Sequence, residues 1–96
     1  MPSSKPLTYE GLLKLARAAE GHTLHTVTGK KFTVGIYRDA LFFTPASSGY
    51  GQADGRSPVE RFIQRYNETG SMRPGDYAGL TRNASYLIGL VLHTEG

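Results

Sequence analysis

The sequence contains no cysteine. A disulfide bond, a thiolate metal site and a thiol nucleophile are therefore all excluded. A reducing compartment is permitted. We predict a cytoplasmic location, because the first ten residues, MPSSKPLTYE, have neither the apolar core of a secretory signal nor the arginine-rich character of a transit peptide.

Long apolar stretches are also missing. The longest, residues 87 to 92, contains Gly89 and is far shorter than the ~20 residues needed to cross a bilayer. We therefore predict no transmembrane segment and no membrane partner. Residues 1 to 6 hold two prolines and two serines and are predicted to form a flexible tail, and residues 7 to 96 have the length of a single domain.

Recognisable catalytic and metal-binding motifs are absent as well. The sequence has no glycine-rich phosphate-binding motif, no Gly-x-Ser-x-Gly elbow and no group of neighbouring acids. His22 and His25 lie three positions apart in a strand-like segment, so we expect their side chains on opposite faces, where they do not share a metal ion. We predict no metal site and no cofactor. Whether the protein is an enzyme stays open, and the absence of motifs weighs against it.

The apolar pattern predicts a small α+β fold. Thr8 is a good N-cap for a helix over residues 9 to 20, which Gly21 ends. Three segments of strand character follow at 22 to 28, 31 to 37 and 40 to 44, and their short connections indicate a three-stranded antiparallel meander. Period-two alternation places Phe32, Val34 and Phe43 on the face toward the helices.

A long surface loop is predicted for residues 45 to 57, because this stretch is rich in glycine and poor in apolar residues. Ser57, Pro58 and Glu60 form the pattern of a capping box, with proline at the first helical position, and predict a helix that Gly70 ends. A last helix, from Thr81 or Asn83 to His93, is apolar nearly all round and is either a core helix or half of a dimer contact. The expected order is α-β-β-β-α-α, with the helices packed on the sheet.

Positive charge is concentrated in the second part of the chain. Eleven lysines and arginines against eight acidic residues give a net charge of +3, and six of the seven arginines follow residue 37. Arginine donates in a fork that matches phosphates, base edges and carboxylates. A mildly basic protein of this kind favours polyanionic partners.

Residues 67 to 86 place arginine, asparagine, serine and tyrosine around the start of the last helix. Free N–H groups and the helix dipole favour an anion there, and arginine and asparagine read guanine and adenine in bidentate fashion. The connection from Gly70 to Thr81 is too long for a helix-turn-helix motif, and a plain link between two helices is the structural alternative. Residues predicted to contact nucleic acid or another partner are Arg61, Arg65, Arg73, Tyr77, Arg82, Asn83 and Ser85.

Two further features have alternative interpretations. Arg61 and Arg65 lie one turn apart and could reach one run of phosphates, but with Glu60 and Glu68 nearby they also match a solvated, ion-paired helix face. A predicted aromatic platform on the outer sheet face and the adjoining loop consists of Tyr37, Phe42 and Tyr50. Bases stack on such rings, and protein interfaces are enriched in the same residue types.

These observations predict a small cytosolic nucleic-acid-binding module, with DNA favoured, such as a bacterial or mobile-element accessory protein. The contact surface would be the start of the last helix. One alternative is a protein-interaction or inhibitor domain, which could form a homodimer through the C-terminal helix. A weaker alternative is a small metal-independent ribonuclease that uses Tyr77, Arg73, Arg82 and one histidine.

Overall fold

The computed structural model of the chain describes residues 7 to 49 and 51 to 95. The predicted tail, residues 1 to 6, lies outside this range. The helices are α1 (Tyr9–Ala19), α2 (Arg56–Thr69) and α3 (Ala84–Glu95), with a short 3-10 helix, η1 (Pro74–Tyr77), before α3. The strands are β1 (Leu24–His25), β2 (Lys31–Tyr37), β3 (Ala40–Pro45) and β4 (Gln52–Asp54). The predicted α+β class is confirmed.

The sheet is an antiparallel meander in the order β1-β2-β3-β4. It has one strand more than the three predicted, because β4 lies inside the stretch expected to be a loop. Its residues pair in register with β3, Gln52 opposite Phe43 and Asp54 opposite Leu41. Only β1 is shorter than expected, because the Thr26 hydroxyl accepts a 3.1 Å hydrogen bond from the Lys30 N–H and closes a turn.

The helix boundaries follow local chemistry. The predicted cap of α1 is confirmed, since the Gly11 N–H donates to Thr8 Oγ1 at 2.9 Å. The predicted capping box of α2 is wrong. The helix begins at Arg56 after Gly55, so Ser57 already lies within it, and the Glu60 carboxylate pairs with Arg56. As predicted, α2 ends at Gly70, which adopts a left-handed conformation with φ of 67°.

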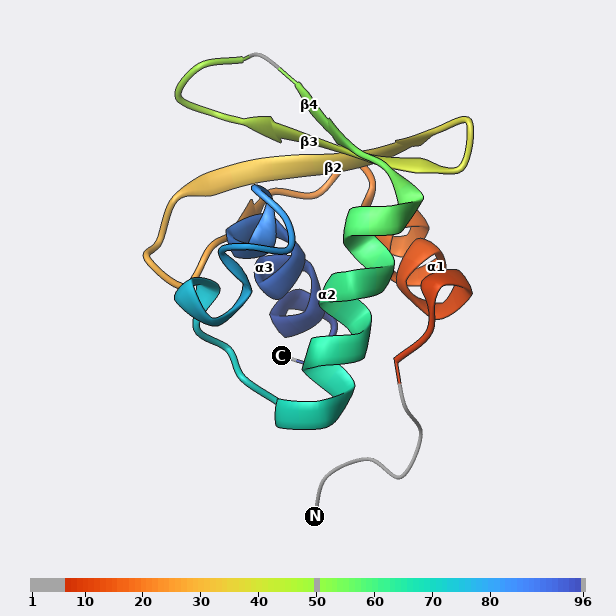
Figure 1. Cartoon of the computed structure of the whole chain (residues 1–96). Coiled ribbons are helices and arrows are strands. Elements are labelled where there is room, and N and C mark those ends of the chain that lie inside the picture. Colours follow the sequence, from red (N-terminus) through yellow and green to blue (C-terminus); the bar gives the residue numbers. More distant parts are fainter. Residues whose placement is uncertain (1–6, 50, 96) are drawn as a thin grey trace.

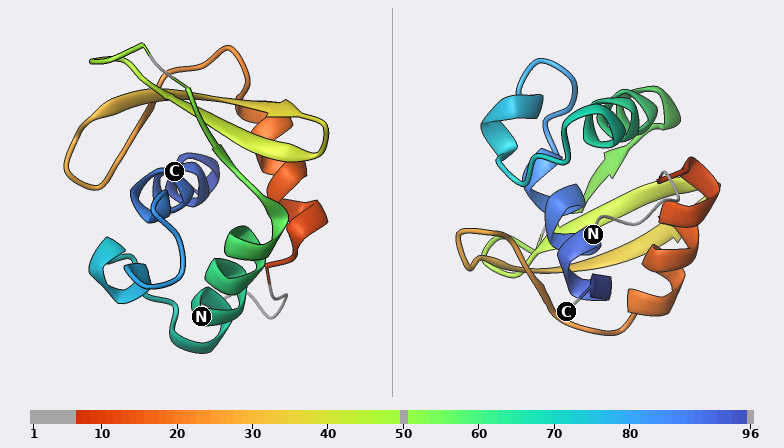
Figure 2. Two further views of the ribbon diagram at one scale, coloured as in Figure 1. Left: turned by 45° about the horizontal axis from the view of Figure 1, so that its top comes forward. Right: turned by 90° about the horizontal axis from the view of Figure 1, so that it is seen from below.

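All three helices cover one face of the sheet, and α3 lies beneath the sheet and packs against α1 and β1 (Figures 1 and 2). The inner side chains of β2 and β3 are buried against them, as the alternation predicts. The buried residues of α3 include Leu87, Ile88, Leu90 and Val91. This helix is therefore the core helix of the monomer.

Burial of α3 removes the reason for predicting a dimer through it. Of its large apolar side chains, only Leu92 is exposed, at 38%. A single exposed leucine is ordinary for a protein surface.

Candidate functional site

The outer face of the sheet carries no helix, and the right-hand view of Figure 2 shows the helices together on the opposite face. Two aromatic side chains lie exposed on this outer face, Tyr37 at 65% and Phe42 at 38%. Phe42 is paired with Gly35 and Tyr37 with Ala40, so the two rings are diagonal neighbours on β2 and β3. Diagonal neighbours on one face are about 7 Å apart. The predicted outward orientation of both residues is confirmed.

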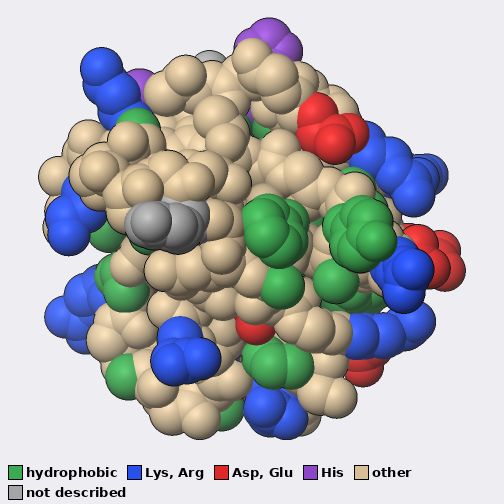
Figure 3. Space-filling model, turned by 90° about the horizontal axis from the view of Figure 1, so that it is seen from above, with side chains coloured by type: hydrophobic (Ala, Val, Ile, Leu, Met, Phe, Trp, Pro, Cys, Tyr) green, Lys and Arg blue, Asp and Glu red, His purple; other side chains and the backbone are tan. Residues whose placement is uncertain are grey.

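Both a cation and a carboxylate lie near these rings. Glu20 Oε2 lies 3.8 Å from the position that a Cβ atom would take at Gly35, which is paired with Phe42. The Arg38 guanidinium lies 5.3 Å from the centroid of the Tyr37 ring. Lys31 is exposed on the same face as Tyr37, at the opposite end of β2. Figure 3 looks down on this side of the molecule and shows apolar side chains with both basic and acidic side chains around them. The third member of the predicted platform, Tyr50, lies outside the described residues.

Phe42 is held against the backbone that leads into β4. A Cβ atom added at Gly51 would lie 1.7 Å from the Phe42 ring, so only glycine leaves room for the ring there. The Phe42 ring therefore extends the outer face to the edge strand β4. We call the outer face around Tyr37, Phe42 and Lys31 the open sheet face.

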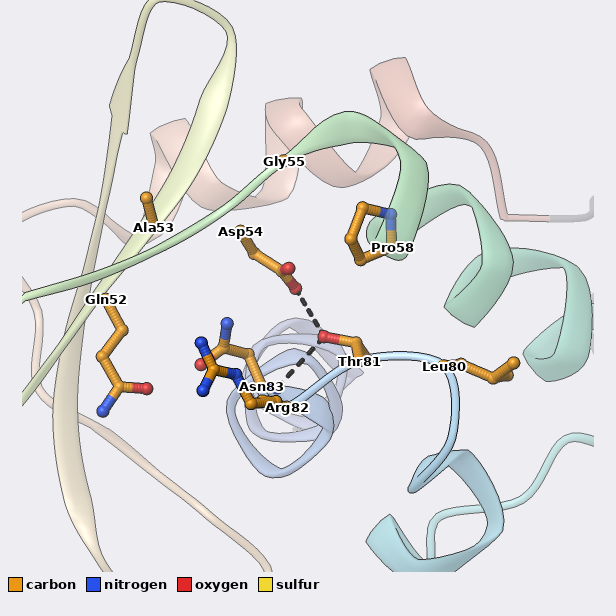
Figure 4. Close-up of a pocket in the computed structure, with 9 residues that line it drawn as sticks. All are labelled: Gln52, Ala53, Asp54, Gly55, Pro58, Leu80, Thr81, Arg82 and Asn83. Carbon is orange, nitrogen blue, oxygen red and sulfur yellow. Dashed lines mark hydrogen bonds between the residues drawn. The ribbon is translucent and has the colours of Figure 1, made fainter.

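A pocket of about 730 Å³ lies at β4, next to this face. It is formed by three segments: β4, the start of α2 and the connection that leads into α3. The lining residues are Gln52, Ala53, Asp54, Gly55, Pro58, Leu80, Thr81, Arg82 and Asn83 (Figure 4). Ala53 pairs with Phe42, so β4 belongs to both the open sheet face and the pocket.

A buried hydrogen-bond network forms the floor of the pocket. Thr81 Oγ1 donates to Asp54 Oδ2 at 2.8 Å, and the Asn83 N–H donates to Thr81 Oγ1 at 3.0 Å. All three residues are buried, with Asp54 and Asn83 each 5% exposed. The network ties the segment before α3 to β4, as the dashed lines of Figure 4 show.

Asp54 is a buried carboxylate that the sequence analysis missed. Burial raises its pKa, and hydrogen bonds from Thr81 and Asn83 and the charge of Arg61 act in the opposite direction. The residue stands in a polar, glycine-rich stretch, which is where surface carboxylates are expected. Its burial depends on pairing with β3, and no local pattern indicates that pairing.

Asn83 is buried and does not lie on the surface as predicted. Its carbonyl oxygen accepts the first helical hydrogen bond of α3, from the Leu87 N–H at 3.0 Å. Its side-chain oxygen, Oδ1, is buried and accepts no hydrogen bond from the residues that the structure describes. Buried polar atoms of this kind are rare in folded proteins.

Tyr77 also differs from the prediction, because its side chain is fully buried. Its ring centroid lies 4.5 Å from that of Phe62, and its hydroxyl donates to the Ser71 carbonyl oxygen at 2.8 Å. Burial raises the pKa of Tyr77. Its role is structural, since the aromatic ring fills the space between η1 and α2.

The predicted arginines do not form one group. Arg65 donates to the Asp76 carbonyl oxygen at 3.2 Å, and Arg73 lies 3.7 Å from the carboxylate of Asp76. Arg82 is exposed at the pocket. Arg61 is exposed on α2, and Ser85, in the first turn of α3, is half-buried. The structure thus brings Arg82 and Asn83 together and separates them from the pair at Asp76.

The residues of the ribonuclease hypothesis do not come together. Tyr77 is buried, and His93 lies eleven residues after Arg82, at the other end of α3, about 16 Å away at 1.5 Å per residue. The His93 ring instead lies 6.0 Å from the ring of His22. Neither Tyr77 nor His93 is therefore placed to act together with Arg82.

Among the described residues, no three histidine or acidic side chains are grouped to hold a metal ion, and no helix has the length and apolarity to span a membrane. No protein-family model matches the chain, and no curated protein or solved structure is significantly similar to it.

Proposed function

We propose that the protein binds single-stranded nucleic acid across the open sheet face. The observation that carries the proposal is the exposure of Tyr37 and Phe42 as diagonal neighbours on a sheet face without helices. Each base of a single strand has a face that stacks on such a ring, and stacking is largely independent of sequence. The two rings could therefore hold two bases of one strand.

The charges around the rings support an anionic partner over a neutral one. Within the described part of the chain, neither Arg38 nor Arg82 has a carboxylate within ion-pair distance. The net charge of the whole chain is +3. An unpaired cation beside an aromatic ring, as Arg38 is beside Tyr37, suits a strand of phosphates and bases, and binding of this kind weakens with salt.

A single strand suits the geometry better than a duplex. A helix that reads a groove must project side chains from its first turn. At the start of α3, Asn83 is buried, and Arg82 stands beside a pocket. DNA stays the first candidate ligand, and we still predict a cytoplasmic location. The test below therefore compares single-stranded DNA with RNA and with duplex DNA.

Fluorescence anisotropy of labelled oligonucleotides tests the proposal. We expect single strands to bind more tightly than duplex, with an affinity that falls as salt rises. Phe42→Ala should weaken binding by roughly 5- to 100-fold, the range for loss of one stacked base.

Leu92→Ala is the matched control, because Leu92 has the same 38% exposure as Phe42 but lies on α3, away from the open sheet face. It should leave the affinity unchanged. If Phe42→Ala and Leu92→Ala bind alike, or if no strand binds at low salt, the proposal is wrong.

A further inference from the structure

A glycine leaves an open position in the middle of the open sheet face. Gly35 lies on β2 directly opposite Phe42, and a side chain at this position would point outward, as those of Thr33 and Tyr37 do. Glycine in the interior of a strand often marks a place where another group approaches the backbone closely. The Gly35 backbone is therefore accessible from the outer face.

The aromatic side chains do not fill this position. Apart from its chain neighbours, a Cβ atom added at Gly35 would have only one described atom within 4 Å, and this atom does not belong to the Phe42 ring. The Phe42 ring lies against Gly51 instead, where an added Cβ would be 1.7 Å from it. The ring thus turns toward β4, and a flat molecule can lie on the Gly35 backbone beside it.

The one atom near this position is a carboxylate oxygen, Glu20 Oε2, 3.8 Å from the added Cβ. Glu20 directly follows α1, which packs against β2. Since β1 pairs only with Lys31 and Phe32, no described strand covers the edge of β2 at Gly35, and the Glu20 side chain passes this edge. The carboxylate is exposed and has no ion pair within the described part of the chain.

The chemistry of a carboxylate selects one base among the five. An ionised carboxylate has two acceptor oxygens and no donor, and it binds best to two parallel N–H donors, as in its bidentate pairs with arginine. Guanine alone presents two such donors side by side on its Watson–Crick edge, the ring N1–H and the amino group. Adenine and cytosine set their amino group beside a bare ring nitrogen, and thymine and uracil set their ring N–H between two carbonyl oxygens.

We propose that the open position at Gly35 receives a guanine of the bound strand, with the N1–H and the amino group of the base donating to the two oxygens of Glu20. This inference rests on the proposed function. It adds a base preference to a surface on which stacking is largely independent of sequence.

The charge of Glu20 acts on every strand, whatever its bases. A carboxylate beside Phe42 repels phosphates, and only a base that donates to both oxygens offsets the repulsion. A penalty of this kind against other bases is a common source of specificity. Loss of the charge should therefore raise the affinity for strands without guanine and abolish the preference for guanine.

Base analogues test the inference in the unaltered protein. A short single strand of thymine with one central guanine is compared by fluorescence anisotropy with two analogues at the same place. Hypoxanthine keeps the ring N–H but lacks the amino group, and 2-aminopurine keeps the amino group but lacks the ring N–H. We expect guanine to bind about tenfold more tightly than either, the size of one lost hydrogen bond to a charged group. Affinity for guanine equal to that for either analogue would overturn the inference.

Glu20→Gln gives the second readout. The variant keeps the size of the side chain but replaces one acceptor oxygen by a donor and removes the charge. It should bind the guanine and hypoxanthine strands equally and bind a strand of thymine alone more tightly than the parent does. If Glu20→Gln retains the preference for guanine, the inference is wrong.

Glu68→Gln is the matched control. Glu68 is also exposed and carries the same charge, but it lies on α2, on the opposite side of the sheet from the open sheet face. This variant should keep the tenfold preference for guanine. A loss of the preference in both variants would show that the net charge, and not a contact with Glu20, sets it, and would contradict the inference.

The two proposals fail in different ways. Salt-dependent binding that is sensitive to Phe42→Ala but indifferent to guanine would leave the proposed function standing and remove the role of Glu20. Absence of binding to every strand would contradict both.

Discussion

Asp54 ionises in a buried position at the wall of the pocket. Its carboxylate accepts hydrogen bonds from Thr81 and Asn83, which partly compensate for lost hydration. The same contacts orient Asn83, so this one residue connects the stability of the protein with the shape of the pocket. Its raised pKa gives a testable dependence of stability on pH.

Asp54→Asn should change how stability varies with pH. Because burial raises the folded-state pKa of Asp54 above the ordinary value of about 3.9, the folded protein holds this proton more tightly than the unfolded chain. Its contribution is thus fully present at low pH and is lost as pH rises through the folded pKa. Asp54→Asn has no carboxyl group at this position, so its stability does not fall in this way.

Urea unfolding from about pH 3 to pH 7 measures the effect, since other carboxylates titrate alike in both proteins. As pH rises through the folded-state pKa of Asp54, the free energy of unfolding of the parent should fall relative to that of Asp54→Asn. At higher pH the difference between the two proteins should stay constant. A parent that gains stability relative to the variant over this range would show that the hydrogen bonds outweigh burial.

At the scale of elements, the contact between α3 and the sheet depends on a glycine. A Cβ atom at position 89 would lie 2.7 Å from the His25 carbonyl oxygen and 2.9 Å from the Phe32 ring. Glycine thus permits the core helix to approach β1 and β2 closely. The position of α3 in turn sets the position of Asn83 at its start.

Gly89→Ala should destabilise the protein by about 1 to 3 kcal/mol, the usual cost of overpacking. Alanine is the better helix former by about 1 kcal/mol, so the same substitution in a helix with no close neighbour would raise stability. Thermal or urea unfolding measures the difference. Gly75→Ala is the control, because no atom lies within 4 Å of its added Cβ. An unchanged or higher stability of Gly89→Ala would contradict the close approach.

For individual helices and strands, sequence patterns predict the features that neighbouring residues determine. Alternation predicts the orientation of Phe42 on β3, and the hydroxyl of Thr8 predicts the start of α1. Strand β4 escapes prediction because Gln52–Asp54 is short and polar, and its formation depends on β3. The burial of Tyr77 likewise depends on Phe62, fifteen positions earlier.

In the candidate site too, features set by the local sequence are predictable, and features set by contacts between distant segments are not. Tyr37 and Phe42 could be assigned to the outer face from period two alone. The pocket could not be predicted, because β4 and the segment before α3 are separated by a whole helix in the sequence and come together only in the folded protein, where Thr81 donates to Asp54. Arg82 and Asn83 lie at the start of the last helix, as predicted, and this start is also part of the junction with β4.

At the scale of the whole molecule, the two faces of the sheet have different roles. The inner face and the three helices form the core, and the described helices leave the outer face uncovered. Its rings, its cations and the pocket at β4 are neighbours, so one strand could contact all of them. We propose that this face, and not the helical side, binds nucleic acid.

Chemical-shift mapping by NMR tests that claim most directly, and a chain of 10.5 kDa is well suited to it. Unlabelled single-stranded DNA is added to the isotope-labelled protein, and the shifted amides are assigned. We predict the largest shifts in β2, β3 and β4, around Tyr37, Phe42 and Ala53. Shifts confined to α1 and α2, around Arg61 and Arg65, would contradict the account.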